Sequence, residues 1–216
     1  MRLPLPQFKP ESRAAAHVAE VIETSTTCFL AQCLEPEELN FPPMPAFGSW
    51  VKSQDEESGH TIMAIVVNAT TAPIDSIHRA RALGLTLDEL RQQQPQIFAM
   101  LKTEFTAVIM GFISNNDRDR GKAYQYLPPR PPQIHQSVHQ CTTEEVIHFT
   151  QDLSFLRLLL VITDVPSESL ISAVIRTIYQ IRKGERSWLV RAGRELSLLL
   201  KDDYDKLRYI LSQIHA

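Results

Sequence analysis

The chain has few of the residues on which most catalytic motifs depend. Its 216 residues include seven glycines and three cysteines. No phosphate-binding loop G-x-x-x-x-G-K-[ST] is present, because the Gly121-Lys122 pair has Asn116 where the first glycine should stand and Ala123 in place of the hydroxyl residue. The patterns G-x-G-x-x-G, G-x-S-x-G, H-E-x-x-H and C-x-x-C are also absent. These absences exclude a P-loop ATPase, and they lead us to expect no enzymatic activity, no catalytic residue, no cofactor and no metal.

Long apolar runs are lacking as well. The most apolar stretch, Leu156–Ile162, is far shorter than the roughly 20 residues that a membrane-spanning helix needs. The first twelve residues, MRLPLPQFKPES, contain no apolar segment of the kind found in a signal peptide. Three cysteines cannot all pair in disulfides, which favours a reducing compartment. We therefore expect a soluble, cytoplasmic protein without a membrane segment.

Charge of one sign is not in excess. Lys and Arg number 22 and Asp and Glu number 25, for a net charge of −3, which argues against a chain that neutralises many phosphates at once. The distribution is uneven, with −5 on residues 1–121 and +2 on the remainder. A short stretch of the second half is strongly basic and contains Arg182, Lys183, Arg186, Arg191 and Arg194. We favour a solvated helix face for it, and the alternative is a surface that contacts nucleic acid or a partner.

The first half of the chain, from His17 to about Ile113, alternates β-like runs with turn signals. Phe29, Ala31 and Cys33 share one face of a predicted strand, since side chains alternate along a strand. The runs HTIMAIVVNAT (60–70) and EFTAVIMGFI (104–113) are almost continuously apolar, which indicates strands covered on both faces, inside a small barrel or beneath a helix.

A helical insertion at about 72–103 separates the last two of these strands. Thr86 and Glu89 have the spacing of a capping box, and Pro95 should end one short helix and start a second. The prolines of 128–132 form an extended connector, and everything after His135 is predicted as helix. The interpretation leaves 153–162 open between helix and strand.

The end of the chain shows a heptad-like spacing. Apolar residues recur at intervals of four and three, at Leu200, Tyr204, Leu207, Leu211 and Ile214. This seam predicts burial against a partner helix, within the chain or across a dimer. The fold class is therefore α+β, with a small closed N-terminal β-barrel that carries a helical insertion, followed by an all-helical C-terminal region.

The β-rich half resembles a HAS barrel, the small six-stranded barrel at the N-terminus of HerA-type DNA translocases and of the ATP synthase α and β subunits. The resemblance is seen in three segments, HVAEVIETSTTCFLAQCL, FGSWVKS and HTIMAIVVNAT. The segments APIDSIHRARALG and QPQIFAMLKTEFTAVIMGFI are more closely similar to stand-alone HAS-barrel proteins of cyanobacteria. The resemblance covers roughly residues 14–131, and with the sequence pattern on either side it divides the chain into a flexible arm (1–13), a barrel (14–131) and a helical domain (132–216). It implies a role in assembly or docking, and it transfers no catalytic residue.

Two local clusters are candidates for sites. Asp75, His78, Arg79 and Arg81 combine a carboxylate, an imidazole and two guanidinium groups in the insertion. We favour a structural tie for this cluster, and we keep it as a candidate partner-binding site and, as a weaker alternative, an acid/base pair of Asp75 and His78 in an enzyme of unrecognised type.

The second cluster has side chains of the metal-ligand type, namely His135, His139, Cys141 and His148. Their spacing matches no familiar metal motif, so we interpret them as residues of a linker that enters a helix.

These observations favour a non-enzymatic protein–protein interaction or assembly module, with the barrel as docking surface. The partner is another protein or a second copy of the chain. The alternative is an accessory protein that handles nucleic acid, for example in DNA repair, through the basic stretch.

Overall fold

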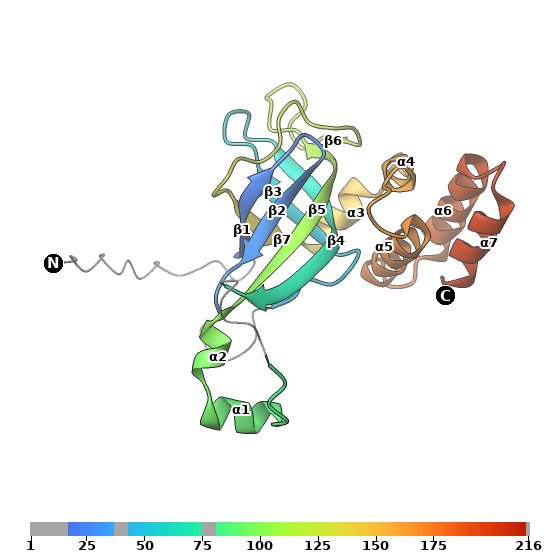
Figure 1. Cartoon of the computed structure of the whole chain (residues 1–216). Coiled ribbons are helices and arrows are strands. Elements are labelled where there is room, and N and C mark those ends of the chain that lie inside the picture. Colours follow the sequence, from blue (N-terminus) through green and yellow to red (C-terminus); the bar gives the residue numbers. More distant parts are fainter. Residues whose placement is uncertain (1–16, 37–42, 75–80, 215–216) are drawn as a thin grey trace.

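The computed structural model describes residues 17–36, 43–74 and 81–214. The predicted arm at 1–13 lies outside these residues. A β-barrel forms one part of the molecule, and helices that follow it in the chain cover one side of the barrel (Figure 1). The α+β class predicted from the sequence is confirmed.

Six antiparallel strands close the barrel. These six strands are β1 (His17–Thr24), β2 (Cys28–Cys33), β3 (Trp50–Gln54), β4 (Thr61–Pro73), β5 (Leu101–Ile113) and β7 (Ser137–Gln140), and the seventh described strand is β6 (Ala123–Tyr124). The order β2-β1-β7-β3-β4-β5 returns on itself because β2 also pairs with β5, and β6 extends the sheet beyond this ring as a short partner of β5.

β4 is continuously apolar because both of its faces are covered, as the sequence predicted. Ile62, Ala64 and Val66 point into the barrel and belong to its core. Met63 and Ile65 point outward into a second core that the barrel shares with the helices. Both faces of the strand are thus removed from water, and neither face needs polar residues.

The interior of the barrel is filled by apolar side chains from all six strands. They include Phe29, Ala31 and Cys33, which confirms the face assigned to these residues. The barrel therefore has a packed core of the kind that small closed barrels form.

The strand β7 differs from the sequence prediction, which placed helix after His135 and ended the barrel at residue 131. β7 pairs with β1 on one side and with β3 on the other. The described helices of the second half begin only at Thr143. Closure of the barrel therefore depends on a strand that lies between the predicted connector and α3, in the region predicted as helical.

The insertion contains the predicted capping box and the predicted helix boundary at Pro95, but it spans fewer residues than predicted. β4 extends to Pro73 and β5 begins at Leu101, so the predicted range of 72–103 includes the ends of both strands. Its helices are α1 (Leu87–Gln93) and α2 (Gln96–Ala99). The capping box of Thr86 and Glu89 is formed, and Pro95 precedes the first residue of α2 as predicted.

The second half contains α3 (Thr143–Phe149), α4 (Phe155–Leu160), α5 (Ser167–Ile181), α6 (Arg186–Leu199) and α7 (Tyr204–Ser212). The region 153–162, left open by the sequence, is helical in α4. Leu170, Ile171, Val174 and Ile175 of α5 are fully buried in the core shared with the barrel. Among the described helices, none is both long and apolar enough to traverse a lipid bilayer.

The predicted C-terminal seam is wrong for two of its five members. Tyr204 is 72% exposed and Leu211 is 43% exposed, whereas Ile210, outside the predicted seam, is fully buried. The reason is a break at residues 200–203, where α6 ends and the Asp203 side chain caps α7 by accepting from the Lys206 N–H. The break changes the phase of the buried face, so one heptad register cannot run through both helices.

Candidate functional site

The predicted cluster in the insertion is only partly described. Asp75, His78 and Arg79 lie outside the described residues, and Arg81 is exposed. The structural tie and the acid/base pair both stay predictions.

The basic stretch divides into one internal and four external cations. The Arg182 side chain is 7% exposed, and its guanidinium lies 5.3 Å from the centre of the Trp188 ring. Its Nη2 donates to the carbonyl of Ile147 at 2.8 Å, and its Nη1 donates to Glu185 at 2.9 Å. Arg182 thus fastens the end of α5 to α3 and to the start of α6, and its cation is not presented to a partner.

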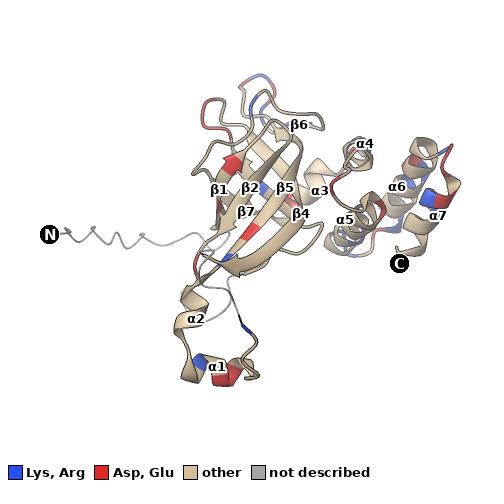
Figure 2. Ribbon diagram, viewed as in Figure 1, with Lys and Arg blue, Asp and Glu red and all other residues tan. Residues whose placement is uncertain are grey.

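The other four cations of the stretch are exposed on the helical half: Lys183, Arg186, Arg191 and Arg194. Arg191 and Arg194 line a surface cleft that also contains Asp152 and Glu195. Basic and acidic segments alternate along α6 and α7 (Figure 2). The surface is therefore mixed in sign.

The four residues of the metal-ligand type have separate surroundings. The His148 Nε2 lies 2.7 Å from the carbonyl of Gly121, and the His139 Nε2 lies 2.9 Å from Ser137 Oγ. His135 is 84% exposed beside Glu20, and Cys141 packs against the helical core. Within the described part of the chain, no three His, Cys, Asp or Glu side chains converge as metal ligands would.

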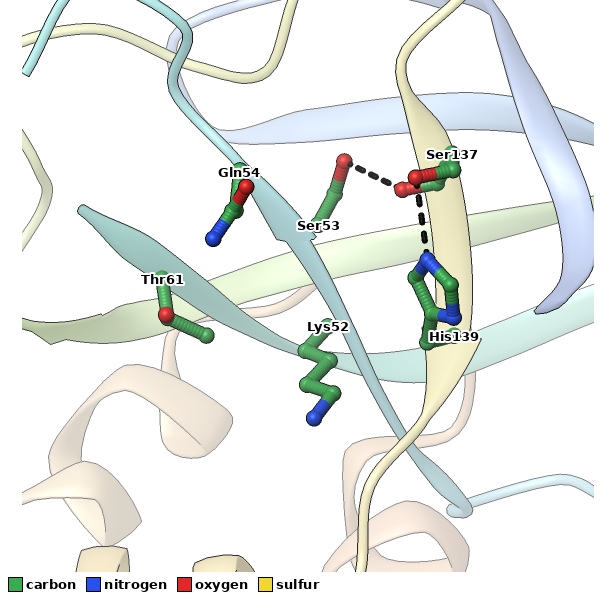
Figure 3. Close-up of a pocket in the computed structure, with 6 residues that line it drawn as sticks. All are labelled: Lys52, Ser53, Gln54, Thr61, Ser137 and His139. Carbon is green, nitrogen blue, oxygen red and sulfur yellow. Dashed lines mark hydrogen bonds between the residues drawn. The ribbon is translucent and has the colours of Figure 1, made fainter. Parts of the chain in front are cut away.

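The structure adds a polar cavity that the sequence analysis did not predict. It has a volume of about 220 Å³ and is lined by Lys52, Ser53, Gln54, Thr61, Ser137 and His139. We call it the seam cavity, because it lies where β7 meets β3. Figure 3 shows Ser137 and His139 on β7, Lys52, Ser53 and Gln54 on β3, and Thr61 on β4.

The cavity exists because β3 and β7 pair over a short distance. Two residue pairs join these strands, Val51 with Gln140 and Lys52 with His139. Beyond them, the Ser53 hydroxyl donates to the carbonyl of Ser137 at 2.9 Å. A side chain thus takes over from the backbone ladder at this point of the barrel wall.

Three basic side chains lie in a row across this wall. His17 on β1 is opposite His139 on β7, and His139 is opposite Lys52 on β3. The two imidazole rings are 5.2 Å apart between centres. Lys52 forms an ion pair with Glu145, whose other oxygen accepts from the Thr142 N–H in the capping box of α3. This ion pair joins the barrel to the first helix of the second half.

Burial, together with the row of basic side chains, favours the neutral form of His139. Burial lowers its pKa, and the neighbouring His17 and Lys52 lower it further, while Glu145 acts in the opposite direction. Like charges directly opposite each other across strands are unfavourable, so the neutral imidazole is the form that suits the folded barrel.

Acidification should therefore weaken the fold through His139. The unfolded chain has a His pKa of about 6.5, above that of folded His139, so near and below this pH the unfolded state binds more protons. The stabilising contribution is present above the unfolded pKa and is lost as the pH falls from it toward the folded pKa. Urea unfolding at a series of pH values between about 7.5 and 5 measures this loss.

The matched variants are His139→Gln and His135→Gln. His139→Gln should flatten the dependence on pH in this window, and His135→Gln should keep the slope of the parent chain because His135 is 84% exposed. Equal slopes in the parent chain and in His139→Gln would contradict the assignment. Carboxylates with a lowered pKa, such as Asp119, lose their contribution to the stability of the fold at lower pH, so they do not affect the comparison of the variants in this pH range.

Two of the three cysteines, Cys33 and Cys141, are not suited to act as nucleophiles. Burial raises the pKa of Cys33 to about 11, and it also raises the pKa of Cys141 strongly. Because the thiolate is the reactive form, both thiols are inert near neutral pH.

Comparison with protein families accounts for the β-rich half. The family model of the HAS barrel domain matches residues 18–115. A comparison with curated proteins gives no match. The matched segment contains five of the six barrel strands, and β7 lies beyond it. Residues 18–115 and the closed barrel that they form with β7 identify this chain as one that carries a HAS barrel domain.

Proposed function

We propose that this chain is a non-enzymatic interaction or assembly module whose HAS barrel provides a docking surface for a protein. The partner is a different protein or a second copy of the chain. The proposal rests on the presence of the HAS barrel domain together with the form of its helical insertion.

The observation that carries the proposal is an ordered helix, α1, whose own residues all stay accessible to solvent. None of the residues of α1 is buried, although the helix is capped by Thr86 and Glu89. Leu83 and Leu87 are 46% and 51% exposed. The insertion extends away from the barrel on a side that the helical half does not cover (Figure 1). A short helix has little stability of its own unless an apolar face is packed against something. The exposed leucines of the insertion therefore favour contact with a partner.

Substitution of the two exposed leucines tests the proposal. Leu83→Glu/Leu87→Glu should keep the fold, because both side chains already face solvent, and it should lose the partner. The measurement is light scattering for the mass of the purified chain, with quantitative affinity capture from a lysate of the source organism.

Leu198→Glu is the matched control, since Leu198 is 70% exposed on the helical half. A protein, or a dimer, that is retained by Leu198→Glu and lost by the double variant supports docking through the barrel. A monomer that captures nothing contradicts the proposal, and loss in both variants places the contact elsewhere.

Nucleic-acid handling is the second candidate function. It is supported by the exposed cations Lys183, Arg186, Arg191 and Arg194, and weakened by the internal position of Arg182 and the acidic neighbours of the stretch. Oligonucleotide binding that decreases steeply with salt would support it, and no binding at about 50 mM salt would remove it.

A further inference from the structure

The seam cavity has a lining suited to one class of ligand. The six described residues that line it supply an ammonium group, an imidazole, three hydroxyls and an amide, and none of these six is a carboxylate. Donor groups of this kind, fixed on a rigid wall, complement a ligand that is rich in hydrogen-bond acceptors.

Strand geometry places the donors on one face. Lys52 and Gln54 alternate with Ser53 along β3, Thr61 pairs with Gln54 across the sheet, and Ser137 and His139 are two residues apart on β7. By the two-residue period, all but Ser53 point to the outer face of the barrel. Val138, between Ser137 and His139, belongs to the interior core and confirms the direction.

Hydrogen-bonding capacity remains in this region. The buried Nε2 of His17 finds no hydrogen-bond partner among the described residues. An ammonium group has three hydrogens, and the ion pair with Glu145 engages one oxygen of that carboxylate with Lys52. Glu145 is held at the N-terminus of α3 and does not line the cavity.

We propose that the seam cavity binds a small oxyanion of the size of sulfate or phosphate, with Lys52, His139 and Ser137 as its donors. The volume of about 220 Å³ admits such an ion together with water. The site is independent of the docking role of the insertion, which lies elsewhere on the barrel.

Binding should depend on pH through the row of basic side chains. A doubly charged anion next to His139 favours the imidazolium form, and it offsets the repulsion from His17 on β1 and Lys52 on β3. Within the described part of the chain, Glu145 on α3 is the one carboxylate that influences the pKa of His139, and it competes with the ligand for Lys52. Affinity should therefore increase as the pH falls.

Sulfate is the sharper probe, because its charge stays constant over this range. Isothermal titration calorimetry of the intact chain with sodium sulfate, at matched ionic strength in chloride, should give an affinity about ten-fold higher at about pH 5.5 than at about pH 8. Inorganic phosphate should bind to the same site and compete with sulfate.

Three variants locate the site. His139→Gln should lower sulfate affinity about ten-fold and remove its dependence on pH, and Ser137→Ala should lower the affinity without removing that dependence. His135→Gln, outside the cavity, should bind as the parent chain does. Should His139→Gln not fold, the shift of the His139 imidazole signals on sulfate addition, followed by NMR in the parent chain, decides in its place.

No sulfate heat beyond that of chloride, an affinity independent of pH, or an equal loss in His135→Gln would overturn the proposal. Loss of protein docking in the leucine variants of the insertion would leave sulfate binding intact, so the two proposals fail separately.

Discussion

Val138→Glu is expected to abolish the folded barrel. Val138 is fully buried at the centre of β7, inside the core that the six strands share. Removing one partner of a buried ion pair leaves an unpaired buried charge and destabilises a protein by about 3–5 kcal/mol. A new buried carboxylate should have a similar cost, and a whole domain is stable by only about 5–15 kcal/mol. Circular dichroism during heating and in urea measures the loss.

Gln140→Glu is the matched control for this prediction. Gln140 is on the same strand and is exposed, so the same new carboxylate should change the free energy of unfolding by no more than about 0.5 kcal/mol. If Val138→Glu unfolded at the temperature of the parent chain, β7 could not be the strand that completes the barrel.

Gly111→Ala is expected to destabilise the chain by about 2 kcal/mol or more, from overpacking and backbone strain together. Gly111 has a φ of +142°, and a Cβ there would overlap the carbonyl oxygen of Tyr124 and lie 3.0 Å from the Phe149 ring. The position is tight because β5 has an irregular register with β4 between Met63 and Ala64, next to Gly111, while β6 and α3 pack close by. Urea unfolding gives the change in free energy.

Gly193→Ala provides the contrasting result. Gly193 lies within α6, and a Cβ there meets no atom within 4 Å. Alanine is the better helix former, so this variant should be more stable by about 0.5–1 kcal/mol. A similar loss in both glycine variants would show that steric overlap at Gly111 is not the cause.

The barrel could be predicted because its strands carry long, regular signals. The alternation of Phe29, Ala31 and Cys33 and the continuous apolarity of β4 each reflect which faces are covered. β7 could not be predicted in the same way. Only Val138 of its four residues points into the core, and its pairing strands lie far away in the chain. A strand of this length is defined by its neighbours and has too few residues to show a period.

The candidate site was harder to predict for the same reason. The seam cavity combines residues of β3, β4 and β7, and its row of basic side chains adds His17 from β1. No local sequence motif predicts that these residues lie together, because the pairing register of the strands brings them together. His139 was noticed as a candidate ligand, whereas Lys52 and Ser137 had no signal in the sequence.

The contact between Arg182 and Trp188 could not be predicted from the sequence either. A cluster of cations on a helical stretch looks the same whether its members face water or stack on an indole ring. The structure distinguishes them through the 7% exposure of Arg182, which removes one of the five cations from the predicted surface.

The late position of β7 also bears on how the protein is made. The chain leaves the ribosome from its N-terminus, so five barrel strands emerge before the sixth. The edges of β1 and β3 that pair with β7 therefore stay unpaired until about residue 140 has left the ribosome. During that interval the nascent chain presents open strand edges to its surroundings, and we expect chaperone association to peak in this window of translation.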